Sequence, residues 1–180
     1  MQRTIKHIVF VLIAAVVLVS CKNGESLQSY FVNNQEASNF ISQDIPISMV
    51  KIDDSEFTEE QKEAYKSVKR LNFLGYNVDG TEAETFKAEL AKVKTILKDE
   101  KYIDLMEFSD KGNKIVVKYI GTDEEADEIV VFGSAKELGF GIVRILGDDM
   151  SPDKMGSLVT AMQNANVDEN QVQDIMNLFK

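Results

Sequence analysis

Between residues 102 and 146 the chain contains four runs of β-branched and aromatic residues, each followed by a short stretch of turn-forming residues. Links this short join neighbouring antiparallel strands, whereas parallel strands need crossovers of a dozen or more residues. The runs therefore predict a four-stranded antiparallel meander, with strands at 102–108, 114–120, 128–132 and 140–146. The apolar core of the third run, Ile129 to Phe132, does not alternate with polar residues, so we expect this strand near the sheet centre with both faces covered.

Segments on the N-terminal side of the meander add one or two strands. Val68 to Tyr76 predicts one strand, and Phe40 to Ile45 predicts a weaker one that Pro46 ends. Capping chemistry, in which a side-chain oxygen accepts from a free backbone N–H group, predicts helices that begin after Thr58, Thr81, Ser151 and Asp168.

The predicted helices have apolar stripes that suit packing on a sheet. The strongest stripe runs through a helix from about Glu82 to Lys98, and the last predicted helix runs from about Glu169 to Phe179. The fold class is therefore α+β: one domain over residues 38–180, with a largely antiparallel β-sheet packed by helices. A chain of this length buries roughly 70% of the surface that it exposes when unfolded.

The N-terminus has the pattern of an export signal. Arg3 and Lys6 precede twelve uninterrupted apolar residues, Ile8 to Val19, a run too short to cross about 30 Å of hydrocarbon. Residues 1–20 are therefore interpreted as a signal peptide. The run ends in Leu18-Val19-Ser20-Cys21, which resembles a bacterial lipobox, and this resemblance implies that Cys21 is acylated and becomes the first residue of the mature chain. The alternative is a buried anchor helix with an incidental Cys.

A lipidated Cys21 would hold the domain at a membrane, because each buried CH₂ of its palmitate-like chains adds about 0.8 kcal/mol. Residues 21–37 then form a lipidated tether, with a small apolar cluster at Leu27, Tyr30 and Phe31 spaced for one short helix. Lys22 stands where an inner-membrane retention signal would place Asp, by resemblance to lipoproteins, which favours the outer membrane.

Charge and missing residue types exclude several classes of function. Removal of residues 1–20 takes two of the 20 basic residues and none of the 30 acidic ones, which leaves a net charge of −12. Such a protein should repel nucleic acid. The only His is His7 and the only Cys is Cys21, so a mature chain has no Ser-His-Asp or Cys-His catalysis, no His- or Cys-ligated zinc and no disulfide. We predict no catalytic set, no cofactor and no metal.

Three patterns remain as candidates for chemistry, and each also has a plainer interpretation. Asp104 shares its predicted strand face with Tyr102, Met106 and Phe108, a setting that would raise the pKa of a general acid; the alternative is a solvated rim carboxylate. Arg144 lies on an otherwise apolar face and could clamp a ligand carboxylate; the alternatives are an internal ion pair with a neighbouring acid, or a side chain that extends off the sheet edge into water. A third pattern is an acidic run between two predicted strands, made up of Asp123, Glu124, Glu125, Asp127 and Glu128. This acidic run could bind Ca²⁺ through oxygen ligands, or form a solvated hairpin tip.

Two shorter patterns are weaker. Ser48 with Lys51 and Ser151 with Lys154 have the Ser-x-x-Lys spacing of a nucleophile and base, without the partner motifs of penicillin-recognising enzymes. Glycines at 139, 141 and 147 superficially suggest a phosphate loop, although strand glycines more often mark a bulge or close packing.

The strand block also resembles a known family. Tyr102 to Met106, the turn at 110–112 and Ile142 to Gly147 followed by a helix are similar to a family of Bacteroidetes lipoproteins with a domain of unknown function, DUF4252. The family's Ile-Ser segment is echoed by Ile41-Ser42 or Ile47-Ser48. The resemblance implies export, lipidation and a single domain, and genomic company with extracytoplasmic-type sigma factor systems. It implies no activity and no catalytic residue.

Three hypotheses follow. The first is a membrane-anchored, non-enzymatic binding, sensing or interaction module of the cell envelope, with a possible envelope or signalling protein as partner. That partner would use the sheet face or an adaptable methionine surface, formed by Met150, Met155, Met162 and Met176; the alternative is that these residues fill the core. The second is an envelope hydrolase with paired carboxylates, and the third is a small-ligand carrier that uses Arg144.

Overall fold

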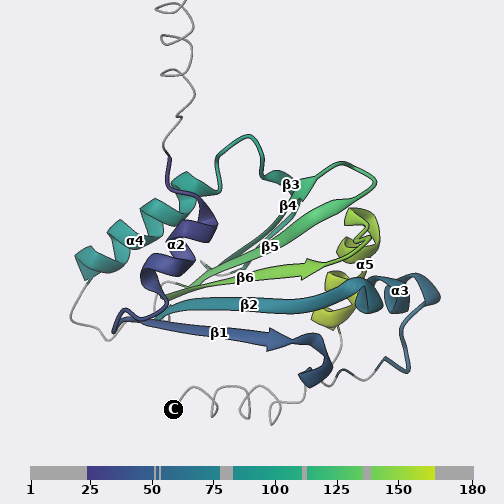
Figure 1. The fold of residues 1–180 in the computed structure, drawn as a ribbon. Coiled ribbons are helices and arrows are strands. Elements are labelled where there is room, and N and C mark those ends of the chain that lie inside the picture. Colours follow the sequence, from purple (N-terminus) through teal and green to yellow (C-terminus); the bar gives the residue numbers. More distant parts are fainter. Residues whose placement is uncertain are drawn as a thin grey trace, which may run out of the picture.

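The computed structural model describes residues 24–50, 52, 54–77, 83–110, 113–135 and 139–164. Six strands form one sheet in the order β1-β2-β6-β5-β4-β3, and every neighbouring pair is antiparallel (Figure 1). The last four strands in the chain are the predicted meander, and β1 and β2 are the predicted N-terminal strands. The bounds are β1 Phe40–Pro46, β2 Val68–Asn77, β3 Ile103–Asp110, β4 Asn113–Gly121, β5 Ala126–Ala135 and β6 Gly139–Gly147.

Within the described residues four helices pack on this sheet, so the α+β single-domain prediction is confirmed. They are α2 Leu27–Asn34, α3 Glu59–Ser67, α4 Ala83–Ile96 and α5 Pro152–Asn164, with a short 3-10 helix, η1 Ile47–Met49. The capping box predicted at Thr58 is present, since its hydroxyl accepts from the Gln61 amide and the Gln61 side chain accepts from the Thr58 amide. Pro152 is the first residue of α5, where its missing N–H group removes no hydrogen bond.

One face of the sheet packs against α2 and α4. Because side chains alternate between faces along a strand, Leu74 and Tyr76 of β2 lie on the same side as Phe140 and Ile142 of β6, their register partners. These residues form one core cluster with the apolar faces of the two helices, chiefly Leu27, Tyr30 and Phe31 of α2 and Val93, Ile96 and Leu97 at the end of α4.

The opposite face packs against α3 and α5. Its core cluster includes Val68 and Ile145 from the strands, Ala64 from α3, and Met155 and Leu158 from α5. The two helix pairs therefore cover different faces toward different ends of the strands, with α2 and α4 at one end and α3 and α5 at the other (Figure 1).

The prediction for the third meander strand is confirmed. β5 lies at the sheet centre between β6 and β4. Ile129 belongs to the core on the α3–α5 face and Val130 to the core on the α2–α4 face, and both are fully buried. This strand needs apolar side chains on both faces, which is why its sequence does not alternate.

The glycines of β6 serve close backbone packing. Gly139 has φ +111°, and a Cβ there would collide with the carbonyl oxygen of Tyr76. A Cβ on Gly147 would collide with the carbonyl oxygen of Ser67. The strand-packing reading of these residues is therefore the right one, and the phosphate-loop reading is wrong.

Some predicted features lie outside the described residues: Cys21, Thr81, Lys51 and the helix at Glu169–Phe179. The apolar cluster expected within the tether is α2, and Leu27 and Tyr30 in this helix are almost fully buried. The packed body therefore begins at Leu27, and only five residues, 22–26, separate that position from Cys21.

Candidate functional site

Arg144 and Glu128 form the most buried ion pair among the described residues. The guanidinium Nε and Nη2 atoms donate to the two carboxylate oxygens of Glu128 at 2.6 and 2.7 Å, and both side chains are only 11–12% exposed. The hydrogen bonds to Glu128 raise the pKa of Arg144 above its ordinary value. The guanidinium carbon also lies 5.4 Å from the centre of the Phe31 ring of α2.

This geometry decides among the interpretations of Arg144. A bidentate carboxylate partner from the neighbouring strand already occupies the donor fork that a ligand would need. The internal ion pair is therefore correct, and Arg144 is not the carboxylate clamp that the carrier hypothesis requires.

Asp104 does not have the apolar surroundings expected for a general acid. The register of β3 shifts between Asp104 and Met106, where a β-bulge adds one residue. Met106 and Phe108 therefore point to the α3–α5 face, while Asp104 pairs across the sheet with Lys118, its carboxylate 2.6 Å from the ammonium group. The Asp104 side chain is 81% exposed, so the solvated-rim reading is correct.

The acidic run is divided between a turn and a strand. Asp123 lies at the β4–β5 turn and accepts a 2.7 Å hydrogen bond from the Tyr119 hydroxyl, whereas Glu128 points into the sheet toward Arg144. Within the described ranges, no three His, Cys, Asp or Glu side chains converge as metal ligands. The structure therefore favours the hairpin-tip reading over a calcium site.

Ser151 and Lys154 lie beside a cleft of about 370 Å³ between α3 and α5, the α3–α5 cleft. Lys154 Nζ is 2.5 Å from Glu63 Oε2, and this contact raises the pKa of the lysine. A general base must be deprotonated near neutral pH. Because the contact with Glu63 favours the protonated lysine, Lys154 is poorly suited to act as a general base. Ser48, in η1, is exposed.

A larger cleft of about 640 Å³ lies between the start of α2 and the C-terminal half of α4, and is called the α2–α4 cleft. Its lining contains two basic and two acidic residues from three segments of the chain. These segments are the residues before α2, the exposed side of α4 and the turn that leads to β3, and they contribute Gly24, Glu25, Lys92, Asp99, Lys101 and Tyr102.

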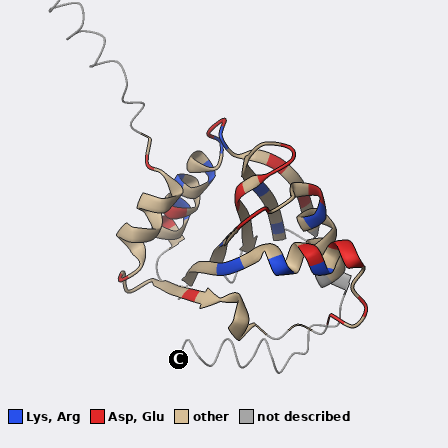
Figure 2. Cartoon of the chain, turned by 45° about the vertical axis from the view of Figure 1, so that its right-hand side comes forward, with Lys and Arg blue, Asp and Glu red and all other residues tan. Residues whose placement is uncertain are grey.

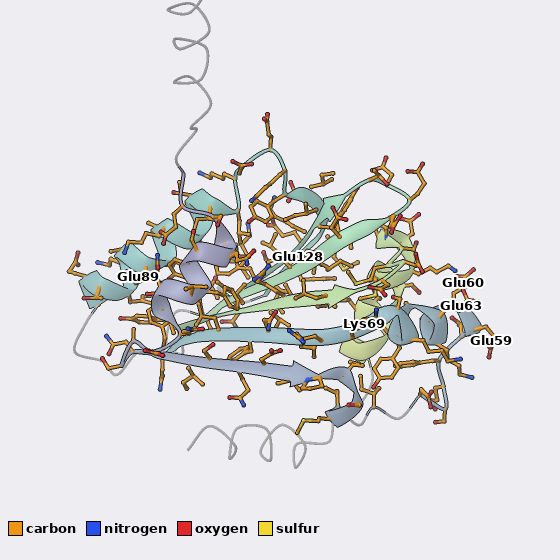
Figure 3. All side chains as sticks on the ribbon, viewed as in Figure 1. Glu59, Glu60, Glu63, Lys69, Glu89 and Glu128 are labelled. Atoms are coloured by element: carbon orange, nitrogen blue, oxygen red, sulfur yellow. The ribbon has the colours of Figure 1, made fainter. Side chains whose placement is uncertain are left out.

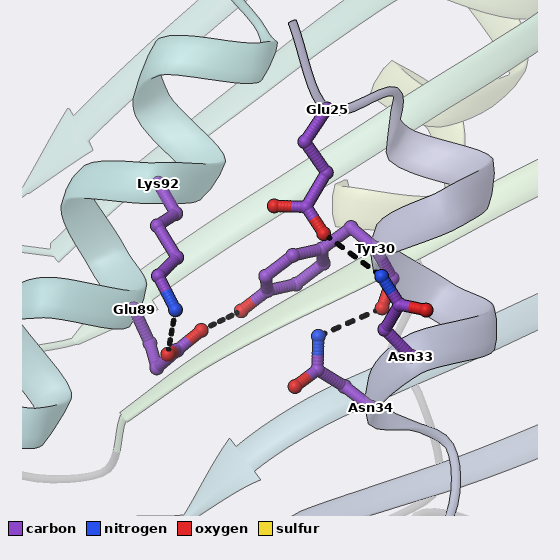
Figure 4. Close-up of polar contacts among 6 residues, drawn as sticks. All are labelled: Glu25, Tyr30, Asn33, Asn34, Glu89 and Lys92. Carbon is purple, nitrogen blue, oxygen red and sulfur yellow. Dashed lines mark hydrogen bonds and ion pairs between the residues drawn. The ribbon is translucent and has the colours of Figure 1, made fainter.

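A hydrogen-bonded network joins the two helices beneath this cleft (Figure 4). The hydroxyl of Tyr30, a fully buried residue of α2, donates to Glu89 Oε2 of α4 at 2.8 Å. The other oxygen of Glu89 lies 2.6 Å from Lys92 Nζ. Burial, followed by the hydrogen bond to Glu89, raises the pKa of Tyr30 far above its ordinary value, so the phenol stays protonated in the folded state.

This network predicts loss of stability in alkali. Because the folded-state pKa of Tyr30 is raised, its contribution is complete below the unfolded-state value of about 10 and is lost as pH rises above it. Tyr30→Phe should cost about 1–2 kcal/mol at pH 7, where it removes a hydrogen bond to a carboxylate, and should flatten the decline in melting temperature above pH 10. Thermal melts of both proteins from pH 7 to 11.5 test this, and parallel curves above pH 10 would contradict it.

A comparison with protein families finds a match over most of the chain. A family model described as a domain of unknown function, DUF4252, matches residues 30–158. The chain belongs to the DUF4252 family. The match extends from Tyr30 in α2 to Leu158 in α5 and so includes all six strands. No curated protein and no solved structure matches this DUF4252 chain, so the family assignment brings no activity with it.

Two methionines of the DUF4252 domain are core residues rather than an adaptable surface. Met150 and Met155 are 0% and 1% exposed and belong to the core cluster on the α3–α5 face. For these two residues the core-filling alternative is confirmed and the methionine-surface interpretation is wrong, because their side chains fill space between α5 and the sheet. The side chains of Met162 and Met176 lie outside the described part of the chain.

Charge is unevenly distributed over the DUF4252 domain. Apart from the buried Glu128, residues 122–127 and 148–154 contain seven carboxylates and one lysine, and a β-bridge between Ala126 and Met150 joins the two segments. They lie near α3, whose Glu59, Glu60 and Glu63 are at the far end of the domain from Glu89 (Figures 2 and 3). In contrast, residues 83–102, at the α4 end, contain five lysines and four carboxylates. No described helix is long and apolar enough to cross a membrane.

Proposed function

We propose that this DUF4252 protein is a lipid-anchored, non-enzymatic interaction module of the bacterial cell envelope, held through Cys21 at the outer membrane. The observation that carries the proposal is the short distance in sequence between the lipobox cysteine and the folded core. Leu27 is 1% exposed and is only six positions after Cys21. Six extended residues reach about 20 Å, so the anchor keeps the α2–α4 end of the domain close to the bilayer.

The charge distribution supports one orientation of the anchored domain. Acidic residues gather around the β4–β5 turn, α3 and the start of α5, and anionic headgroups repel them. The α4 end is nearly neutral over residues 83–102 and lies beside the residues that follow the predicted anchor. The acidic end therefore faces away from the membrane and is the part available to other envelope components.

The contacts of the candidate side chains support a non-enzymatic role. Asp104 is ion-paired to Lys118 at the rim of the sheet, Arg144 is held by Glu128, and Lys154 is held by Glu63. The hydrolase and carrier hypotheses relied on the first two of these residues. Neither side chain lines either of the two clefts described above.

Crosslinked capture of the full-length protein from its native membranes tests the proposal. We expect an envelope protein at comparable abundance, with crosslinks at the acidic end and with a yield that falls as salt screens the charges. Glu59→Gln/Glu60→Gln should reduce the yield several-fold, whereas the matched variant Glu84→Gln/Glu100→Gln at the α4 end should not. An empty capture, or equal yields from the two variants, would contradict this account.

A further inference from the structure

We propose that the α2–α4 cleft binds the headgroup of a phospholipid with a primary amine, a phosphoethanolamine group, in the membrane that holds Cys21. Lys92 and Lys101 face the phosphate, and Glu25 and Asp99 face the ammonium group. The proposal rests on the lipid anchoring proposed above. Headgroup binding in this cleft would orient the tethered domain on the bilayer.

The chemistry of the cleft matches both charges of such a headgroup. Lys92 Nζ lies 2.6 Å from Glu89 Oε1, and Glu89 also accepts the hydrogen bond from Tyr30. Lys101 Nζ lies 5.0 Å from the centre of the Tyr102 ring. On the opposite wall, Glu25 accepts a 3.2 Å hydrogen bond from Asn33 (Figure 4). Asp99 accepts a 3.2 Å hydrogen bond from the backbone amide of Lys101, which fixes the turn. Two cations and two carboxylates therefore line one opening of about 640 Å³.

The position of the cleft places it at the level of the headgroups. Gly24 belongs to the cleft wall and is three residues after Cys21, so their Cα atoms lie within about 10 Å of each other. The polar layer on each side of a bilayer is roughly 5–7 Å thick beyond the hydrocarbon. With an acylated Cys21 at the top of the hydrocarbon, the chain therefore keeps the Gly24 wall of the cleft within about 10 Å of the hydrocarbon surface, a distance that includes this layer.

Weak recognition is sufficient here because the tether supplies a high local concentration. The binding charges are exposed, and exposed ion pairs contribute about 0.2–1 kcal/mol each. Once the domain is tethered, headgroups surround the cleft, and the second binding event becomes effectively intramolecular. A contact that is negligible in dilute solution can then select one orientation of the domain.

Ethanolamine and choline headgroups distinguish this proposal from general attraction to a membrane. Both carry a phosphate and a positive charge, but only the primary ammonium has N–H groups to donate to Glu25 and Asp99. Binding that depends on these carboxylates should therefore prefer phosphatidylethanolamine over phosphatidylcholine.

Hydrogen exchange of the full-length lipidated protein in vesicles tests the proposal. Amides of residues 24–26 and 99–102 should exchange about threefold to tenfold more slowly in vesicles that contain phosphatidylethanolamine than in pure phosphatidylcholine. Lys92→Gln/Lys101→Gln should abolish this difference. Lys66→Gln/Lys69→Gln, at the α3–α5 cleft, should retain it and serves as the matched control.

Two further measurements make every outcome informative. In the first, soluble glycerophosphoethanolamine is added to the detergent-solubilised protein and amide exchange is measured again. Slower exchange in phosphatidylethanolamine vesicles supports the proposal, whether or not the soluble headgroup also slows exchange. Protection by the soluble group alone, or by neither source, overturns it. In the second, mass spectrometry of the Cys21 peptide from the same sample shows whether the chain is acylated. If Cys21 is acylated and exchange is not slowed, headgroup binding is refuted and the proposed function still stands. If Cys21 is not acylated, the proposed function itself is refuted.

Discussion

Cys21→Ser should eliminate incorporation of an alkynyl fatty acid into the protein in living cells. A serine has no thiol to receive the first lipid, and the chain offers no other cysteine. Because each buried CH₂ contributes about 0.8 kcal/mol, loss of two or more acyl chains removes well over 10 kcal/mol of membrane affinity. The measurement is in-gel detection of the label on the immunoprecipitated protein, and the expected signal is that of an unlabelled control.

The same variant should also change the length of the chain. Without lipidation we expect residues 1–20 to remain attached, so membrane fractionation alone is an insufficient readout, since the apolar run Ile8 to Val19 can still hold the precursor. Ser20→Ala, which keeps a small residue before Cys21, is the matched control and should be labelled normally. Full labelling of Cys21→Ser would show that the lipobox interpretation is wrong.

Glu128→Gln should lower the free energy of unfolding by about 3 kcal/mol. The substitution removes the charge that compensates the Arg144 guanidinium, and breaking a buried pair costs about 3–5 kcal/mol. We expect the lower end of that range because both side chains keep about a tenth of their surface exposed. Urea denaturation of the two proteins measures the difference.

Two variants separate the buried pair from charge removal in general. Glu107→Gln removes a carboxylate from an exposed pair with Lys114, whose side chains are 54% and 43% exposed, and should cost at most about 0.5 kcal/mol. Arg144→Met/Glu128→Leu removes both charges and should recover much of the loss. Equal costs for Glu128→Gln and Glu107→Gln would contradict the structural role of the pair.

The sequence predicted the strands better than the side-chain partners. All six strands were expected near their observed bounds, because short links and apolar runs are local signals. The environment of Asp104 was predicted wrongly, since one extra residue in a β-bulge moves Met106 and Phe108 to the other face. No local pattern in the sequence specifies such a bulge.

The partner of Arg144 and the two clefts depend on the topology. Glu128 and Arg144 are 16 positions apart, and their contact requires that β5 and β6 are neighbours in a defined register. The sequence predicts an internal ion pair as one of several alternatives for Arg144, but does not identify its partner. The α2–α4 cleft joins residues 24–26 to residues 88–102, and no sequence spacing reveals that juxtaposition. The network of Tyr30 with Glu89 was missed for the same reason.

The central claim is that the folded domain is held at a membrane by an acylated Cys21. Its most direct test is the intact mass of the protein purified from its native membranes, together with the mass of its N-terminal peptide. We predict a mature chain that begins at Cys21, lacks residues 1–20 and carries the added mass of acyl chains on that residue. A chain that retains residues 1–20, or that begins elsewhere with no added lipid mass, would contradict the account.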